Sequence, residues 1–99
     1  MFAVTVTEPS GAYYTKLFHR AEISIGRGPE NDLVLPDDNV STRHAKLTVR
    51  DGKFIIVDSG STNGVYVNGR IATKPIVING PNTIHIAVFE LSVSIVRSS

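Results

Sequence analysis

The sequence predicts a single all-β domain folded as an antiparallel β-sandwich, and three observations lead to that prediction. The chain has 99 residues, which is enough for one domain with its own core. Val, Ile and Thr account for 12, 10 and 8 residues, whereas Leu and Ala account for only 5 and 6. β-Branched side chains are stiff at χ1 and fit pleated surfaces. Short alternations of apolar and polar residues are separated by turn dipeptides, and no segment shows helical spacing.

The first strands follow from this alternation. We expect strands over residues 2–6, 45–49 and 54–57, in which apolar side chains either recur at every second position or form a short buried run. Asp51 and Gly52 separate the last two segments. This dipeptide is typical of a type I′ hairpin turn, because both residues tolerate positive φ angles. Residues 45–57 are therefore predicted to form a hairpin.

The C-terminal half continues the pattern. Further short strands, each bounded by turn residues, are expected over 65–67, 70–71, 76–78, 83–86 and 89–96. Asn68 and Gly69 are interpreted as turn formers, and the strand over 76–78 is expected to end at Asn79 and Gly80. About ten short strands with regularly spaced turns indicate a sandwich or a barrel.

Composition excludes several classes of protein. No apolar run approaches the 18 residues of a membrane helix, and the N terminus lacks the basic and apolar regions of a signal peptide. The absence of Cys excludes disulfide scaffolds and thiolate metal sites. We therefore expect a cytoplasmic protein without a membrane partner. The chain stops three residues after its last apolar position, so we expect residues 1–99 to be one domain of a longer protein.

The polar residues do not form a recognisable catalytic, metal or nucleotide site. Ser41, His44 and Asp58 are available, but no nucleophile elbow accompanies them, and we expect no enzyme. The three His residues include no i, i+4 pair, so neither a metal nor another cofactor is expected. Basic residues are scattered, and the net charge is only +1, which argues against nucleic acid.

A small anion site is the chemistry that remains. Arg27 lies between glycines, so the backbone there can approach a ligand closely. Ser41 and Thr62 offer hydroxyls, Arg43 offers a second guanidinium, and Asn63 offers an amide that both donates and accepts. From spacing alone, the same residues also fit ordinary turns and solvated strand ends.

Four motifs in one order sharpen this interpretation. They are Ile-Gly-Arg at 25–27, Asn-Asp-Leu-Val-Leu at 31–35, Val-Ser-Thr-Arg-His-Ala at 40–45, and the block from 58 to 69 that contains Asn63 and Gly64. In order and spacing they resemble the forkhead-associated (FHA) domain over essentially the whole chain. The resemblance implies a β-sandwich of about eleven strands, of the SMAD/FHA type, that binds phosphothreonine peptides through loops at one end.

The resemblance also assigns roles to residues. It implies that Arg27 and Ser41 bind phosphate and that Thr62 and Asn63 contact the ligand. Other positions are implied to contact phosphate or a flanking residue, namely Thr42 and Arg43. The remaining positions are implied to be structural, namely Gly26, His44, Gly64, Asn68 and Gly69.

Two functions follow as expectations. The first is a module that recognises phosphothreonine in partner proteins and acts in signalling or assembly that depends on a Ser/Thr protein kinase. The second is a phospho-independent interaction or oligomerisation domain with the same fold. Retention of Arg27, Ser41 and Asn63 together favours the first. The acidic Asp37 and Asp38 just before Ser41 are expected to disfavour an acidic residue about three positions after the phosphothreonine.

Overall fold

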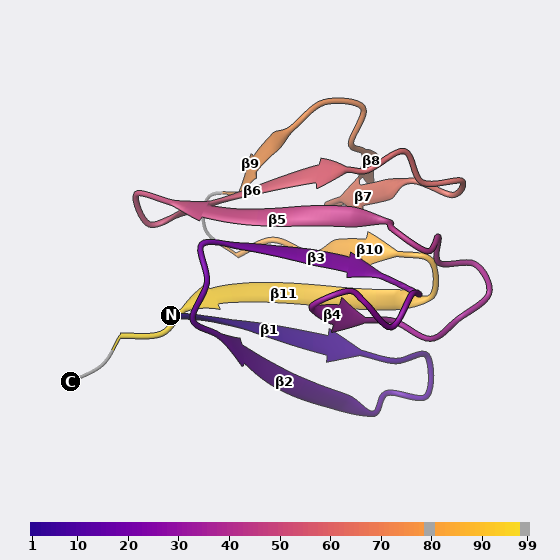
Figure 1. The fold of residues 1–99 in the computed structure, drawn as a ribbon, viewed down its shortest axis with the longest axis horizontal. Helices are drawn as coiled ribbons and strands as arrows, with labels where there is room; N and C mark the ends of the chain where they lie inside the picture. The colour runs from indigo at the N-terminus through magenta and orange to yellow at the C-terminus, as the bar shows by residue number, and fades with distance from the viewer. Residues whose placement is uncertain (79–80, 98–99) are drawn as a thin grey trace.

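Eleven β-strands in two sheets form the fold of the computed structural model, which describes residues 1–78 and 81–97 (Figure 1). The strands in chain order are β1 (Phe2–Thr7), β2 (Tyr13–Phe18), β3 (Glu22–Gly26), β4 (Leu33–Val34), β5 (Ala45–Arg50), β6 (Lys53–Asp58), β7 (Val65–Val67), β8 (Arg70–Ile71), β9 (Ile76–Ile78), β10 (Ile84–Ile86) and β11 (Phe89–Ile95). The prediction of an all-β sandwich of about eleven strands is confirmed.

The two sheets differ in size and in one pairing. The larger has the order β2-β1-β11-β10-β7-β8, and every pair in it is antiparallel. The smaller has the order β4-β3-β5-β6-β9. Its β3–β4 pair is parallel, with Ile25 opposite Leu33, so the expectation of antiparallel pairing does not extend to this edge. The chain between these strands therefore crosses over as a loop of six residues rather than a tight turn.

The core lies between the sheets and consists of the inward side of each alternation. On the larger sheet Val4, Val6 and Leu91 are fully buried, and on the smaller sheet Ile25 and Leu47 are. Such burial of aliphatic side chains is the main driving force of folding. The ring of Phe2 stacks on Phe18 and meets Phe54 edge-on, which joins the two sheets at one end of the core.

The predicted type I′ turn at Asp51 and Gly52 is present, and the predicted turn at Asn68 and Gly69 has the same geometry. Asp51 and Gly52 have φ angles of 52° and 74°, and Asn68 and Gly69 have φ angles of 50° and 82°. Positive φ at both central residues is what this turn requires. The predicted strand end at residues 79–80 lies outside the described residues.

Three strands of the structure have no counterpart in the alternation analysis: β2, β3 and β4. In β2 five of the six residues are exposed, because it is an edge strand that extends beyond the core. An edge strand with solvent near both faces needs no period-2 pattern. The sequence of β2 therefore has no alternation that would predict a strand.

The connections are unequal at the two ends of the sandwich. Strands β1, β3, β6 and β10 run toward one end, on the right in Figure 1, where the longer polar loops that follow β3, β4 and β6 also gather. The two-residue turn after β5 lies at the other end. The turn after β7 lies partway along the larger sheet, because Val67 pairs through Ile84 and Leu91 with Val6 of β1. Loops of a sandwich that converge at one end can together form a binding site.

Candidate functional site

Arg27 lies immediately after β3, and neighbouring backbone fixes its position. Its backbone N–H donates to the Ser41 carbonyl at 3.0 Å. Its Nε donates to the Val40 carbonyl at 3.0 Å, and Nη2 approaches Thr42 Oγ1 at 3.3 Å. These bonds hold an exposed guanidinium in one orientation. A guanidinium has five N–H donors, so several remain for an anion.

Ser41 is positioned by a buried histidine. The Ser41 backbone N–H donates to His44 Nδ1 at 3.0 Å, and His44 Nε2 lies 2.8 Å from the Gly64 carbonyl. Because Nδ1 accepts, Nε2 carries the ring hydrogen and donates it. His44 is completely buried, so the ring joins two loops from inside the molecule.

The Ser41 hydroxyl points toward the other loop of the site. Its Oγ accepts a hydrogen bond from the Thr62 backbone N–H at 3.0 Å. The hydroxyl hydrogen is therefore available to a further acceptor. On the same loop, Asn63 Nδ2 donates to the Asn39 carbonyl at 2.8 Å, so this amide also joins the two loops.

The loop that carries Thr62 and Asn63 is ordered locally by a carboxylate. Asp58 Oδ1 accepts the backbone N–H groups of Gly60 and Ser61 at 2.9 Å and 2.7 Å. The Ser61 hydroxyl donates to Asp58 Oδ2 and accepts the Gly64 N–H, both at 2.9 Å. Side-chain bonds of this kind replace the regular ladder where a strand ends.

The buried side chain of Asn31 holds the loop that carries Arg27 in place. The sequence motifs assigned no role to this residue. Asn31 Nδ2 donates to the carbonyls of Gly28 and Thr42 at 2.8 Å and 2.7 Å, and the residue is 7% exposed. A Cβ on Gly26 would lie 2.3 Å from the Thr42 carbonyl oxygen. This close approach requires glycine, which explains the small residue at that position.

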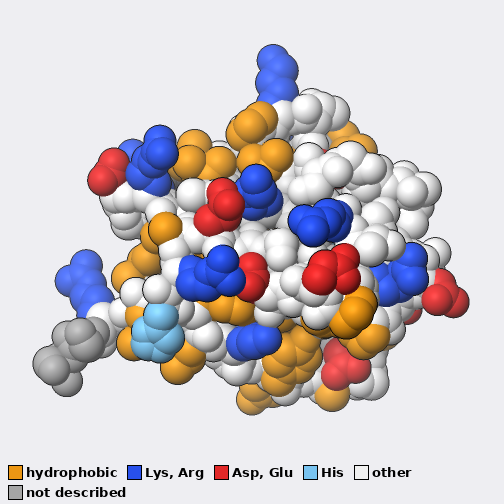
Figure 2. Space-filling model, viewed as in Figure 1, with side chains coloured by type: hydrophobic (Ala, Val, Ile, Leu, Met, Phe, Trp, Pro, Cys, Tyr) orange, Lys and Arg blue, Asp and Glu red, His pale blue; other side chains and the backbone are white. Residues whose placement is uncertain are grey.

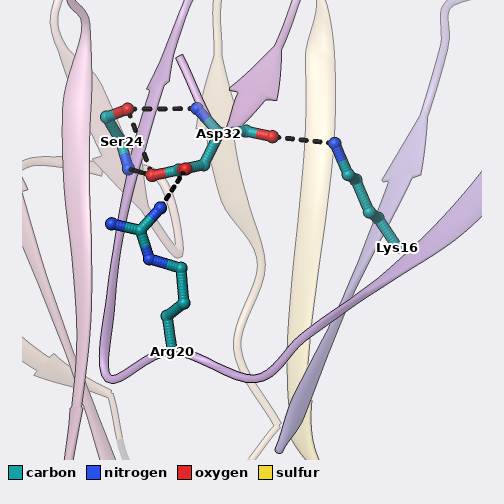
Figure 3. Close-up of polar contacts among 4 residues, drawn as sticks. All are labelled: Lys16, Arg20, Ser24 and Asp32. Atoms are coloured by element: carbon teal, nitrogen blue, oxygen red, sulfur yellow. Dashed lines mark hydrogen bonds and ion pairs between the residues drawn. The ribbon is translucent and has the colours of Figure 1, made fainter.

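Asp32 fastens the same loop to three other segments (Figure 3). Its carboxylate accepts the Ser24 backbone N–H at 2.9 Å and forms an ion pair with Arg20 at 2.7 Å. Its carbonyl accepts a hydrogen bond from Lys16 Nζ on β2 at 2.8 Å. Asp32 thus joins the edge of the larger sheet to the loop of the smaller one. Asn31 and Asp32 are adjacent polar residues in one of the four motifs. Most of their hydrogen-bond partners lie far away in the sequence, so the sequence does not reveal these contacts.

These loops enclose a polar hollow of about 640 Å³. Its lining residues are Arg27, Asp38, Asn39, Val40, Ser41, Thr42, Gly60, Thr62 and Asn63. Five predicted contact residues therefore meet at one place, although up to 36 positions separate them in sequence. A guanidinium, hydroxyls and an amide converge on the hollow beside the carboxylate of Asp38, an arrangement that can hold a small anion next to Arg27.

Other predicted residues lie elsewhere. Arg43 is exposed but does not line the hollow, because the chain directs its neighbour His44 inward. Gly64 has a φ angle of 85° and a carbonyl that accepts from His44. Asn68 and Gly69 form the turn between β7 and β8, which lies partway along the larger sheet and does not line the polar hollow.

The face of the molecule shown in Figure 2 has no strongly charged region of one sign. On the face shown in Figure 2, Lys and Arg side chains alternate with Asp and Glu side chains. The described residues include no cluster of three or more His, Cys, Asp or Glu that could hold a metal ion. Among residues 1–78 and 81–97, no helix has the length and apolar character needed to cross a bilayer.

Comparison with known proteins gives consistent matches. A family model described as "FHA domain" matches residues 23–87. The oxoglutarate dehydrogenase inhibitor of Corynebacterium diphtheriae is 40% identical over 75 residues, which cover 76% of this chain and 52% of that protein. The chain therefore spans about half the length of the curated relatives that it matches.

Solved structures match over nearly the whole chain. Mycobacterium tuberculosis EmbR in complex with a low-affinity phosphopeptide is 28% identical, with a TM-score of 0.79 over 98% of this chain and 25% of that one. A structure described as an analysis of phosphothreonine-dependent FHA domain interactions is 25% identical, with a TM-score of 0.80 and 98% of both chains covered.

Proposed function

The chain belongs to the FHA domain family, and from that premise we propose that it binds phosphothreonine segments of partner proteins at the polar hollow. The observation that carries this proposal is the convergence of Arg27, Ser41, Thr62 and Asn63 on one hollow. The phosphopeptide in the related EmbR structure supports the choice of ligand class. A Ser/Thr protein kinase supplies the modified partner in such a system.

Arg27 and Ser41 suit the phosphate group. A phosphothreonine carries about −1.5 to −2 charges at neutral pH and three strong acceptor oxygens. The Arg27 guanidinium supplies the opposite charge, and its bonds to Val40 and Thr42 fix its direction before the ligand arrives. The Ser41 hydroxyl supplies a further donor. Binding to prearranged donors avoids the cost of ordering these side chains.

Asn63 suits the peptide backbone of the modified residue. The Asn63 amide has a second N–H and an oxygen, with which it can pair to the N–H and C=O groups of a peptide backbone. Val40 also lines the hollow, but it is only 1% exposed and its side chain belongs to the core. One methyl in an apolar contact contributes about 1–3 kcal/mol, so preference over phosphoserine is modest.

We expect binding without catalysis. The Nδ1 atom of His44 accepts the Ser41 backbone N–H, and the Ser41 hydroxyl accepts from Thr62, so the imidazole is not placed to take the hydroxyl proton. The related C. diphtheriae protein is described as an inhibitor. We further propose that residues 1–99 act as one domain of a longer cytoplasmic protein.

A titration tests the proposed function. A phosphothreonine heptapeptide library with randomised flanks first yields the tightest sequence. Isothermal titration then compares that heptapeptide with its phosphoserine and unmodified threonine forms. We expect affinity to fall modestly for phosphoserine and to be lost for threonine. Equal binding of the modified and unmodified peptides would instead identify a phospho-independent interaction domain.

A further inference from the structure

A second hollow lies at the same end of the sandwich, and its chemistry is opposite to that of the first. It has a volume of about 400 Å³ and is lined by Glu8, Pro9, Tyr14, Val34, Pro36, Asp37, Val88 and Phe89. These residues come from the turns after β1 and β10, from β2, from the start of β11, and from the chain at and after β4. Six of the eight are apolar or aromatic, and the two charged residues are both acidic.

The hollow is placed at the seam between the two sheets. Tyr14 belongs to the edge strand β2 of the larger sheet, and Val34 belongs to the edge strand β4 of the smaller sheet. Phe89 is buried and forms its floor, whereas Tyr14 and Val88 are 40% and 45% exposed and form its walls. Two such large apolar side chains at one hollow are available for contact with another molecule.

The lining of this hollow is stiff, and its charge comes from two carboxylates alone. Pro9 and Pro36 have fixed φ angles, so little backbone freedom remains to be lost when a ligand binds. Burial raises the pKa of the Tyr14 phenol above its usual value, and the nearby Glu8 carboxylate raises it further. The phenol therefore stays uncharged at neutral pH, and the negative charge of this hollow belongs to Glu8 and Asp37.

The two hollows are separated by one short turn. Asp37 lines the apolar hollow, whereas Asp38 and Asn39 line the polar one. The turn is closed by hydrogen bonds from the Val40 N–H to the Asp37 carbonyl and from the Asn39 N–H to Asp37 Oδ1, both at 2.9 Å. A chain that leaves the polar hollow across this turn reaches the apolar one directly. The two hollows therefore adjoin each other across this turn.

Resting on the proposed function, we propose that the apolar hollow binds a second segment of the same phosphorylated partner, with aliphatic residues next to an arginine or lysine. The aliphatic side chains lie against Tyr14, Val34 and Val88, and the basic group faces Glu8 and Asp37. The phosphate is attracted to Arg27, although Asp38 also lines that hollow, whereas the apolar hollow has two acids and no basic lining residue. Charge therefore favours one order of the two segments. A linker joins them and makes the second contact intramolecular.

Bipartite peptides test this proposal. The selected phosphothreonine heptapeptide is extended on its N- or C-terminal side by a Gly-Ser linker of two to eight residues followed by Leu-Arg-Leu. The matched probe ends in Ser-Arg-Ser, which keeps the charge and removes the aliphatic groups. Kd values are measured for the wild type, for Val88→Gln and for Val77→Gln. Val77 is a matched control because it is 50% exposed and lies on β9, away from both hollows.

We expect one linker length to bind the wild type about fivefold more tightly with Leu-Arg-Leu than with Ser-Arg-Ser, as partial burial of one Leu implies. Val88→Gln should remove this gain, whereas Val77→Gln should keep it, and neither should change the Kd of the heptapeptide. A gain in affinity that survives Val88→Gln, or no gain from either the N-terminal or the C-terminal extension, overturns the second site alone.

Heptapeptide binding that does not depend on Arg27 overturns the proposed function and this proposal together. A dimer that dissociates on Val88→Gln assigns the hollow to a second copy and also overturns it.

Discussion

The two ends of the sandwich connect strands by different physical means. At one end, Asp51 and Gly52 close a hairpin with two residues whose own φ angles make the turn. At the other end, loops of six to ten residues are held by bonds between distant positions, such as His44 with Gly64 and Asn31 with Thr42. The first kind of connection serves folding. The second presents unpaired donors at fixed places, which is what a binding site requires.

This contrast predicts that mutations will separate affinity from stability according to the end in which they lie. Changes to exposed loop side chains should alter binding, whereas changes to the hairpin turns should alter stability. Substitution of residues buried beneath the loops should lower both affinity and stability. Such variants show how far the two properties can be separated.

The largest expected effect is loss of binding on Arg27→Ala. We expect a cost of about 2–5 kcal/mol in binding free energy, toward the lower value because Arg27 is exposed. The free energy of unfolding should change little. Titration with the phosphothreonine heptapeptide and denaturant unfolding measure the two quantities. Arg50→Ala, at the far end of β5, is the control, and wild-type affinity of Arg27→Ala would refute the assignment.

His44→Ala should lower both stability and affinity. The change leaves the Ser41 N–H and the Gly64 carbonyl without their buried partner and opens a cavity. We expect the free energy of unfolding to fall by about 3 kcal/mol. His85→Ala is a suitable control because His85 is an exposed strand residue. If unfolding is unchanged while affinity is lost, His44 contacts the ligand instead of supporting the loops.

Two glycines give the sharpest matched pair. Gly69 and Gly60 have φ angles of 82° and 86°, and a Cβ at either would meet no atom within 4 Å. Alanine at each should therefore cost about 1 kcal/mol of stability through backbone strain alone. Only Gly60 lines the polar hollow. Thermal unfolding should shift equally for both variants, but only Gly60→Ala should weaken peptide binding. Weaker binding by Gly69→Ala would contradict this separation of hairpin turn from binding loop.

The smallest expected effect concerns pH. Burial raises the pKa of Tyr14 above its usual value near 10, and Glu8 raises it further. Because the pKa is raised on folding, the stabilising contribution is complete below pH 10 and is lost as the pH rises through the pKa of the folded state. Tyr14→Phe should reduce the alkaline loss of stability. Glu8→Gln should lower the Tyr14 pKa only part of the way, since burial remains, as an absorbance titration can show.

The parts of the fold that were predictable are those with local causes. The β5–β6 hairpin follows from alternation on both sides of Asp51 and Gly52. Strand β2 was not predicted, because as an edge strand it is exposed on nearly all its length. The parallel pairing of β4 with β3 depends on bonds from Asn31 and Asp32 to distant segments. The spacing of apolar residues within one segment does not predict hydrogen bonds between distant segments.

The site shows the same division. The motifs correctly indicated that Arg27, Ser41 and Asn63 would come together, although their roles in binding stay a prediction. They included Asn31 but assigned it no role, although its amide donates to the Thr42 carbonyl eleven positions away. They also assigned Arg43 a contact with phosphate or a flanking residue; Arg43 is exposed but does not line the hollow, and its role in binding stays a prediction. Side-chain direction in a short irregular segment depends on which neighbour is buried.

The central claim is that the loop end binds phosphothreonine, and a nuclear magnetic resonance titration tests it most directly. The 15N-labelled domain is titrated with the selected heptapeptide, and backbone amide and Arg27 Nε signals are followed. We predict large shifts for Arg27, Ser41, Thr62 and Asn63, and none for the turns at Asp51 and Asn68. Shifts confined to those turns, or to the outer face of a sheet, would contradict the account.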